Sequence, residues 1–118
     1  MFTDDLSLED FEEEIGEMAH LWKTQSGLPY EVLIDYLGKY RKRVNNSPRI
    51  MIWLDEQSYD FVPISIDKDN PKVLIEKEVP DFEFISDWIK NHYVILMIHW
   101  NRLISDYKAL TLLEKEQE

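Results

Sequence analysis

The most strongly patterned part of the chain runs from residue 80 to residue 107. Apolar residues recur there at steps of three and four, which is the period of an α-helix. This apolar stripe consists of Phe82, Ile85, Ile89, Leu96, Trp100, Leu103 and Tyr107. Asp81 stands at the N-cap position, and Glu83 in the first turn suits the helix dipole. The pattern therefore predicts one long C-terminal helix, with Trp100 buried against the rest of the fold.

The same segment carries apolar residues on a second side of the helix. This second apolar stripe consists of Phe84, Trp88, Ile95 and Ile98. A helix that is apolar on two sides must be covered twice, either by its own fold or by another chain. We expect these four residues to form a candidate interaction surface, with cover from an N-terminal helix favoured and a homodimer as the alternative.

That N-terminal helix is predicted over residues 7–25. Ser7 can cap it, and apolar residues again step by three and four. They are Leu8, Phe11, Ile15, Met18 and Trp22. Gly27 and Pro29 end the helix, because glycine suits a left-handed cap and proline cannot continue a helix.

Between the two helices the apolar positions alternate, which is typical of strands. Strands are expected at residues 30–37, 49–54 and 59–66, with a short fourth at 72–79. Pro63 argues that the third strand lies at a sheet edge or at a bulge. Short connections favour antiparallel neighbours.

The expected fold class is therefore α+β. It comprises a small antiparallel sheet of about four strands, with an N-terminal helix and a long C-terminal helix packed on it. At 118 residues the chain is expected to form a single domain over 1–118, with loose ends at 1–6 and 112–118.

Composition narrows the chemistry that the chain can perform. The absence of cysteine excludes disulfides, thiolate metal sites and cysteine catalysis. Acidic residues stand near the N-terminus where a secretion signal has bases, and the apolar run 93–98 is too short to span a bilayer. We expect a soluble, cytoplasmic protein that does not associate with membranes.

The net charge of −11 is unevenly distributed along the chain. Residues 1–21 hold eight acids and no base, whereas residues 38–49 hold five bases and no acid. Those bases are Lys39, Arg41, Lys42, Arg43 and Arg49. This candidate basic patch could contact phosphate, or it could pair with acids of the same molecule.

Catalytic and metal-binding signatures are not found in the sequence. The three histidines, His20, His92 and His99, lack the spacing of zinc ligands. Residues 67–70 resemble the start of a calcium loop, but the glycine and closing glutamate are missing at the required positions. We expect no catalytic residue, no cofactor and no metal.

Four segments resemble a group of small uncharacterised bacterial domain-of-unknown-function proteins. They are LWKTQSGLP at 21–29, PRIMI at 48–52, FVPISIDKDNPKVL at 61–74 and DFEFISDWIKNHYVILMIHWN at 81–101. The last is also distantly similar to proteins suspected of toxin–antitoxin-like roles. The resemblance implies a small sheet with a C-terminal helix, and no established activity. Those relatives carry a Pro-His-x-His stretch, whereas residues 48–52 contain no histidine.

Two functions are consistent with these patterns. The first is a small, acidic, non-enzymatic domain that binds another macromolecule, with a protein favoured as the partner. The alternative is a toxin–antitoxin-like component that contacts nucleic acid through the basic hairpin 38–49. Because no catalytic signature is present, an enzyme ranks third.

Overall fold

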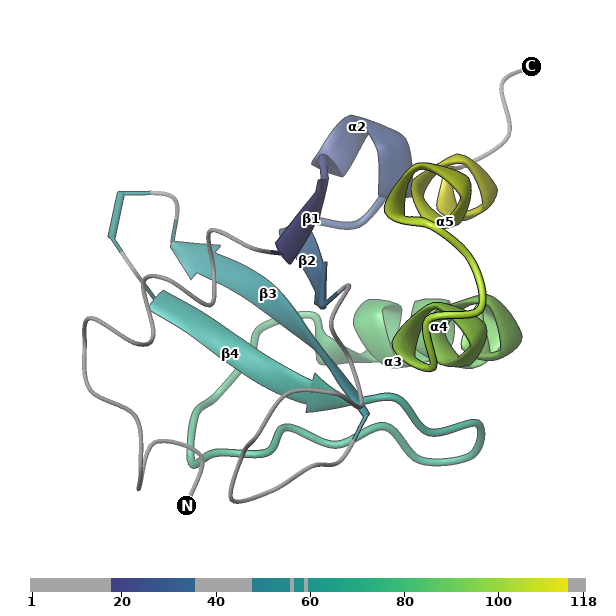
Figure 1. The fold of residues 1–118 in the computed structure, drawn as a ribbon. Helices are drawn as coiled ribbons and strands as arrows, with labels where there is room; N and C mark the ends of the chain where they lie inside the picture. Colours follow the sequence, from purple (N-terminus) through teal and green to yellow (C-terminus); the bar gives the residue numbers. More distant parts are fainter. Residues whose placement is uncertain (1–17, 36–47, 56, 59, 115–118) are drawn as a thin grey trace, which may run out of the picture.

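The computed structural model describes residues 18–35, 48–55, 57–58 and 60–114, which form one antiparallel sheet and four helices (Figure 1). The strands are β1 (Met18–Leu21), β2 (Glu31–Asp35), β3 (Arg49–Asp55) and β4 (Asp60–Ser65). The helices are α2 (Lys23–Ser26), α3 (Phe82–Asn91), α4 (Tyr93–Trp100) and α5 (Asp106–Leu113). The strand order β1-β2-β3-β4 is that of a meander. The expected α+β class with four antiparallel strands is confirmed.

Residues 18–21, which were expected to be helical, form the edge strand β1. Ala19 pairs with Ile34, and Leu21 pairs with Val32. Residues four apart share a face in a strand as well as in a helix, so the spacing of Met18 and Trp22 fits both structures. The expectation for 18–21 was therefore wrong, and residues 7–17 lie outside the described part. Gly27 ends α2 in the left-handed conformation (φ 82°), as the sequence predicts.

The edge position predicted from Pro63 is confirmed, because Pro63 lies in the terminal strand β4. The segment expected as a strand at 72–79 runs beside β4 but forms only the single bridge Ile64–Val73. The backbone N–H of Leu74 donates to the carbonyl of Pro63 over 3.0 Å. Proline has no N–H with which to return that bond, so the ladder stops and the expected strand does not form.

The predicted long C-terminal helix is divided into three. His92, at φ −114° and ψ 17°, separates α3 from α4. Its ring atom Nδ1 lies 2.7 Å from the carbonyl oxygen of Trp88, the same oxygen that accepts the N–H of His92 over 3.0 Å. The carbonyl oxygen of Trp88 thus meets both the backbone N–H and the ring of His92 at the break, a side-chain contact of the kind that accompanies helix bends.

The second break lies between Trp100 and Asp106. Arg102 adopts a left-handed conformation (φ 60°), and its N–H donates to the carbonyl of His99. The N–H of Leu103 donates to the carbonyl of Ile98 over 2.8 Å, which completes a Schellman motif. The Oγ of Ser105 then accepts the N–H of Lys108 and caps α5.

The core lies between one face of the sheet and the helices. Its fully buried members include Val32, Ile34, Ile50, Ile52, Val62, Ile64, Ile85, Ile89 and Leu96. Trp100 is 3% exposed, so its predicted burial is confirmed. Leu103 and Tyr107 were expected in the same stripe but are 72% and 81% exposed, because α4 ends before them. Leu113 is buried, so packed structure extends beyond residue 112, where a loose end was expected.

Candidate functional site

The second apolar stripe does not behave as one surface. Trp88 is 7% exposed and belongs to the core, while Ile95 and Ile98 are half-buried. Phe84, one turn before Trp88, is 57% exposed. Phe84 is therefore the member of the stripe that another molecule can reach most readily.

The exposure of Phe84 follows from the way α3 begins. Asp81 stands at the N-cap position, as predicted, but it is left-handed (φ 60°) and its side chain makes no cap bond. Its carbonyl oxygen accepts the N–H of Phe84 over 3.1 Å. The inward side of the helix is occupied by Ile85, Trp88 and Ile89, which are buried. Phe84 is left at the solvent edge of the first turn.

The start of α3 is fixed to the sheet by Tyr30. Its hydroxyl, at the entry to β2, donates to the carbonyl oxygen of Pro80 over 2.9 Å. Partial burial, together with the negative charge of Asp81, raises the pKa of Tyr30 above its ordinary value. The hydroxyl therefore stays protonated and available as a donor over the physiological range.

Carboxylates flank Phe84 along the chain. Between residues 76 and 91 the sequence has five acids and two bases. Asp81 and Asp87 stand three residues before and after Phe84, and both are exposed. We call Asp81, Phe84 and Asp87 the Phe84 surface.

Both bases of this region are engaged with carboxylates. Lys77 lies 3.2 Å from Asp60, and Lys90 lies 3.4 Å from Asp87. The pair on α3 is exposed and so contributes little to stability. The Phe84 surface is thus an aromatic ring between two carboxylates, one of them weakly paired.

Trp88, one turn after Phe84 on α3, belongs to the core. Its ring centroid lies 4.8 Å from that of His92. Its indole Nε1 is buried and donates to no group in the described ranges. Trp88 is therefore held by packing rather than by a hydrogen bond from its indole to those residues.

Of the five bases in the patch predicted at residues 38–49, Arg49 is the one that lies among the described residues. The other members, Lys39, Arg41, Lys42 and Arg43, lie outside the described residues. Arg49 opens the inner strand β3 and is 3% exposed, with its guanidinium carbon 5.6 Å from the ring centroid of Trp100. The expectation of a surface base at Arg49 was therefore wrong, because strand pairing places it in the interior against an aromatic ring.

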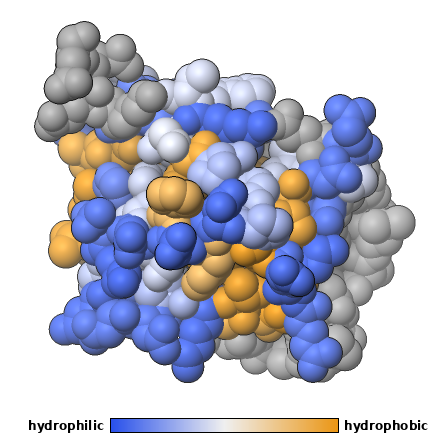
Figure 2. Space-filling view, turned by 180° about the vertical axis from the view of Figure 1, so that it is seen from behind, coloured by the Kyte–Doolittle hydropathy of each residue, from blue (hydrophilic) through white to orange (hydrophobic). Residues whose placement is uncertain are grey.

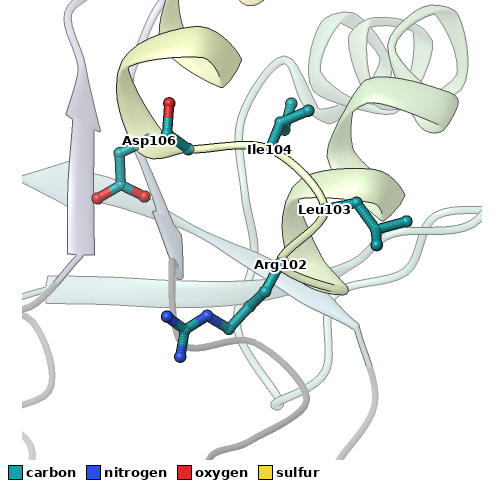
Figure 3. Close-up of a pocket in the computed structure, with 5 residues that line it drawn as sticks. Arg102, Leu103, Ile104 and Asp106 are labelled. Atoms are coloured by element: carbon teal, nitrogen blue, oxygen red, sulfur yellow. The ribbon is translucent and has the colours of Figure 1, made fainter.

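The connection between α4 and α5 forms an open hollow of about 450 Å³ (Figure 3). It is lined by the five consecutive residues 102–106. Asp106 Oδ1 lies 2.8 Å from Nε2 of His99, which is 2% exposed, and Ser105 caps α5. Asp106 therefore ties α5 to α4 and Ser105 caps α5, while Leu103 points away from Asp106 (Figure 3).

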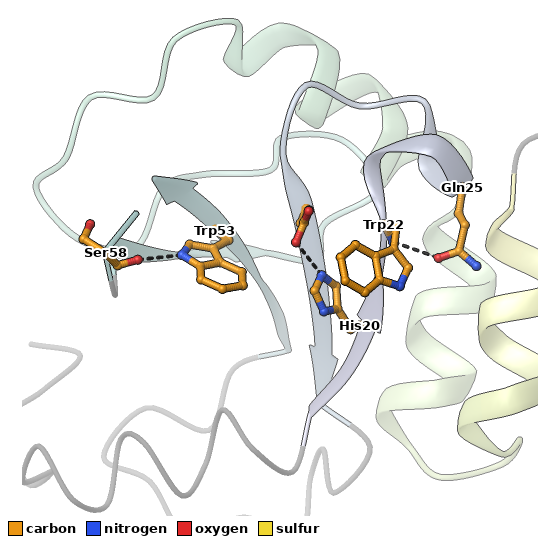
Figure 4. Close-up of polar contacts among 6 residues, drawn as sticks. His20, Trp22, Gln25, Trp53 and Ser58 are labelled. Atoms are coloured by element: carbon orange, nitrogen blue, oxygen red, sulfur yellow. Dashed lines mark hydrogen bonds and ion pairs between the residues drawn. The ribbon is translucent and has the colours of Figure 1, made fainter. Parts of the chain in front are cut away.

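Aromatic side chains gather on the face of the sheet opposite the main core (Figure 4). His20 stacks on Trp22 at 4.1 Å between ring centroids, and its Nε2 lies 2.7 Å from Glu31. Farther along, Trp53 stacks on Phe61 at 5.1 Å and donates from Nε1 to the carbonyl of Ser58. These contacts join β1 to β2 and β3 to β4. They could not be predicted from the sequence, because cross-strand neighbours are distant along the chain.

No group of three or more metal-ligating side chains comes together within the described ranges. In the turn that resembles a calcium loop, Asp67 Oδ1 accepts the N–H groups of Asn70 and Asp69. These backbone donors lower the pKa of Asp67. The carboxylate thus closes a turn.

The surface carries apolar areas as well as charged ones. Figure 2 shows the molecule from behind, with hydrophobic areas bordered by hydrophilic residues. In addition to Phe84, the exposed large apolar residues within the described ranges are Trp22, Val94, Leu103, Tyr107 and Leu112. No described helix is both long enough and apolar enough to cross a membrane.

Comparisons with models of protein families, with curated proteins and with solved structures gave no match. The resemblance of the four sequence segments to uncharacterised bacterial proteins therefore stays a prediction. The geometry of this chain is therefore the basis on which a function can be inferred.

Proposed function

We propose that this protein is a non-enzymatic interaction domain that binds a partner protein through the Phe84 surface. The observation that carries the proposal is the exposure of Phe84, which is 57% accessible on a helix whose residues Ile85, Trp88 and Ile89 are buried. Large aromatic residues are enriched at protein interfaces, where they provide much of the binding energy.

The apolar surface available at Phe84 favours a protein over a small ligand as the partner. Fully burying a phenylalanine contributes about 1.5–3 kcal/mol, and roughly half of that remains available at Phe84. Stable complexes bury about 800 Å² on each partner, so one ring needs a surrounding contact surface. The exposed polar residues along α3, among them Asp87 and Asn91, supply the rim that such interfaces have.

The contacts made by polar side chains away from the Phe84 surface support a non-enzymatic role. Asp106 is held by His99, Ser105 caps a helix, and Glu31 is held by His20. Each of these side chains is committed to a contact that joins two elements or ends a helix.

Co-purification from the cells that make the protein tests the proposal. A tagged chain is recovered as wild type, as Phe84→Ser and as Leu103→Ser, and bound proteins are quantified by mass spectrometry. Leu103 is a matched control because it is also an exposed apolar residue, but on another part of the molecule. We expect Phe84→Ser to lose a partner that Leu103→Ser retains. Equal recovery by all three proteins would refute the proposal.

The partner could be a second copy of the chain. Light scattering of the purified protein detects this case directly. A dimer that Phe84→Ser converts to a folded monomer would identify the homodimer expected as an alternative from the sequence.

A further inference from the structure

We infer that the partner of the Phe84 surface presents an apolar pocket rimmed by lysine or arginine side chains. The inference rests on the proposed function, because it assumes that Phe84 enters a partner. It adds the chemistry of that partner, which the charges around Phe84 specify.

The carboxylates at this end of α3 exceed what the helix itself requires. A helix N-terminus carries the equivalent of about half a positive charge. Asp81, Glu83 and Asp87 place three negative charges within its first two turns. A negative excess therefore remains beside the exposed ring.

That excess is accessible to a partner. Asp81 makes no side-chain cap bond, and the link between Asp87 and Lys90 is an exposed pair at 3.4 Å. Exposed pairs of this kind are worth at most about 1 kcal/mol. A guanidinium or ammonium group of a partner can replace Lys90 at little cost, particularly where the approach of Phe84 to a pocket excludes water.

A second copy of the same chain is a poor occupant of this surface. Each copy carries a net charge of −11, so two copies meeting through acidic faces would repel each other. An anionic polymer such as nucleic acid is disfavoured on the same ground. A basic protein surface complements both the charge and the apolar ring.

Position-specific photocrosslinking distinguishes this local effect from general attraction of cations to an acidic protein. Benzoylphenylalanine replaces Phe84 in one version of the full chain and Leu103 in the other. Both are irradiated in the cells that make the protein, and the crosslinked peptide of the partner is sequenced. We expect a crosslink at position 84, within a segment that holds more lysine and arginine than aspartate and glutamate.

The outcomes separate the two proposals. A crosslink at 84 to a neutral or acidic segment would overturn the inference about charge and leave the proposed function standing. No crosslink at 84 above the level at 103 would overturn both.

A charge variant completes the experiment. Asp87→Asn should lower the crosslink yield from position 84 by about twofold or more, because it removes one of the two carboxylates that flank the ring. Asp69→Asn, which removes the same charge from the exposed 67–70 turn, should have a smaller effect. Equal effects of the two variants would show a general field of the acidic protein and would overturn the inference.

Discussion

Two aromatic residues one turn apart on α3 have different roles. Trp88 is 7% exposed and Phe84 is 57% exposed, although their spacing places both in one stripe. Periodicity reports which side of a helix a residue lies on, but not how far along the helix the covering layer extends. Phe84 stands in the first turn, at the edge of that cover.

This difference predicts opposite responses to the same substitution. Trp88→Glu should destabilise the domain by about 3 kcal/mol or more, because it buries a carboxylate without a partner. Phe84→Glu should change the free energy of unfolding by no more than about 0.5 kcal/mol, because the new charge stays in water. Urea unfolding followed by fluorescence measures both values. A folded Trp88→Glu protein of normal stability would contradict the placement of Trp88 in the core.

Trp100 provides a second test at this scale. It is 3% exposed, and the guanidinium of Arg49 lies over its ring at 5.6 Å. Trp100→Ala should cost about 3–5 kcal/mol from lost packing, and it would also leave a buried cation without its aromatic contact. A Trp100→Ala protein that melts at the wild-type temperature would show that this side chain does not stabilise the core.

Among the elements, three of the four strands were predictable and the helix boundaries were not. β2 and β4 fall within the alternating segments of the sequence, β3 extends one residue beyond its segment, and Pro63 marks the edge strand β4 correctly. β1 was missed because it has only four residues and their spacing is compatible with a helix. Such a short segment shows too little alternation to distinguish a strand from a helix. The division of the C-terminal helix was missed because apolar spacing continues across the breaks. The capping sequence at Ser105 and Asp106 was the available signal.

The break after α4 can be tested at Arg102 with two substitutions that remove the same side chain. In the left-handed conformation, Arg102→Gly should be more stable than Arg102→Ala by about 1 kcal/mol, because alanine is strained there. In a continuous helix the order would reverse by a similar amount, because glycine is a poor helix former. Thermal unfolding of the two variants, measured side by side, shows which of them is more stable. A more stable alanine variant would contradict the structure.

For the whole molecule, the charge balance and part of the candidate site could be predicted from the sequence. The sequence singled out Phe84 as an apolar residue in need of cover, and the structure leaves Phe84 exposed between Asp81 and Asp87. It could not separate Phe84 from Trp88, nor recognise Arg49 as buried, since both distinctions depend on contacts between distant segments. The central claim is that the Phe84 surface binds a partner protein.

The affinity of the co-purified partner for three versions of the chain tests that claim most directly. Isothermal titration calorimetry compares the wild type with Phe84→Ala and with the matched exposed control Leu103→Ala. If Phe84 is an interface anchor, Phe84→Ala should weaken binding by about tenfold or more, which corresponds to roughly 1.4 kcal/mol. Leu103→Ala should stay within about twofold of the wild type. Unchanged affinity of the folded Phe84→Ala protein, or a larger loss at Leu103, would contradict the account.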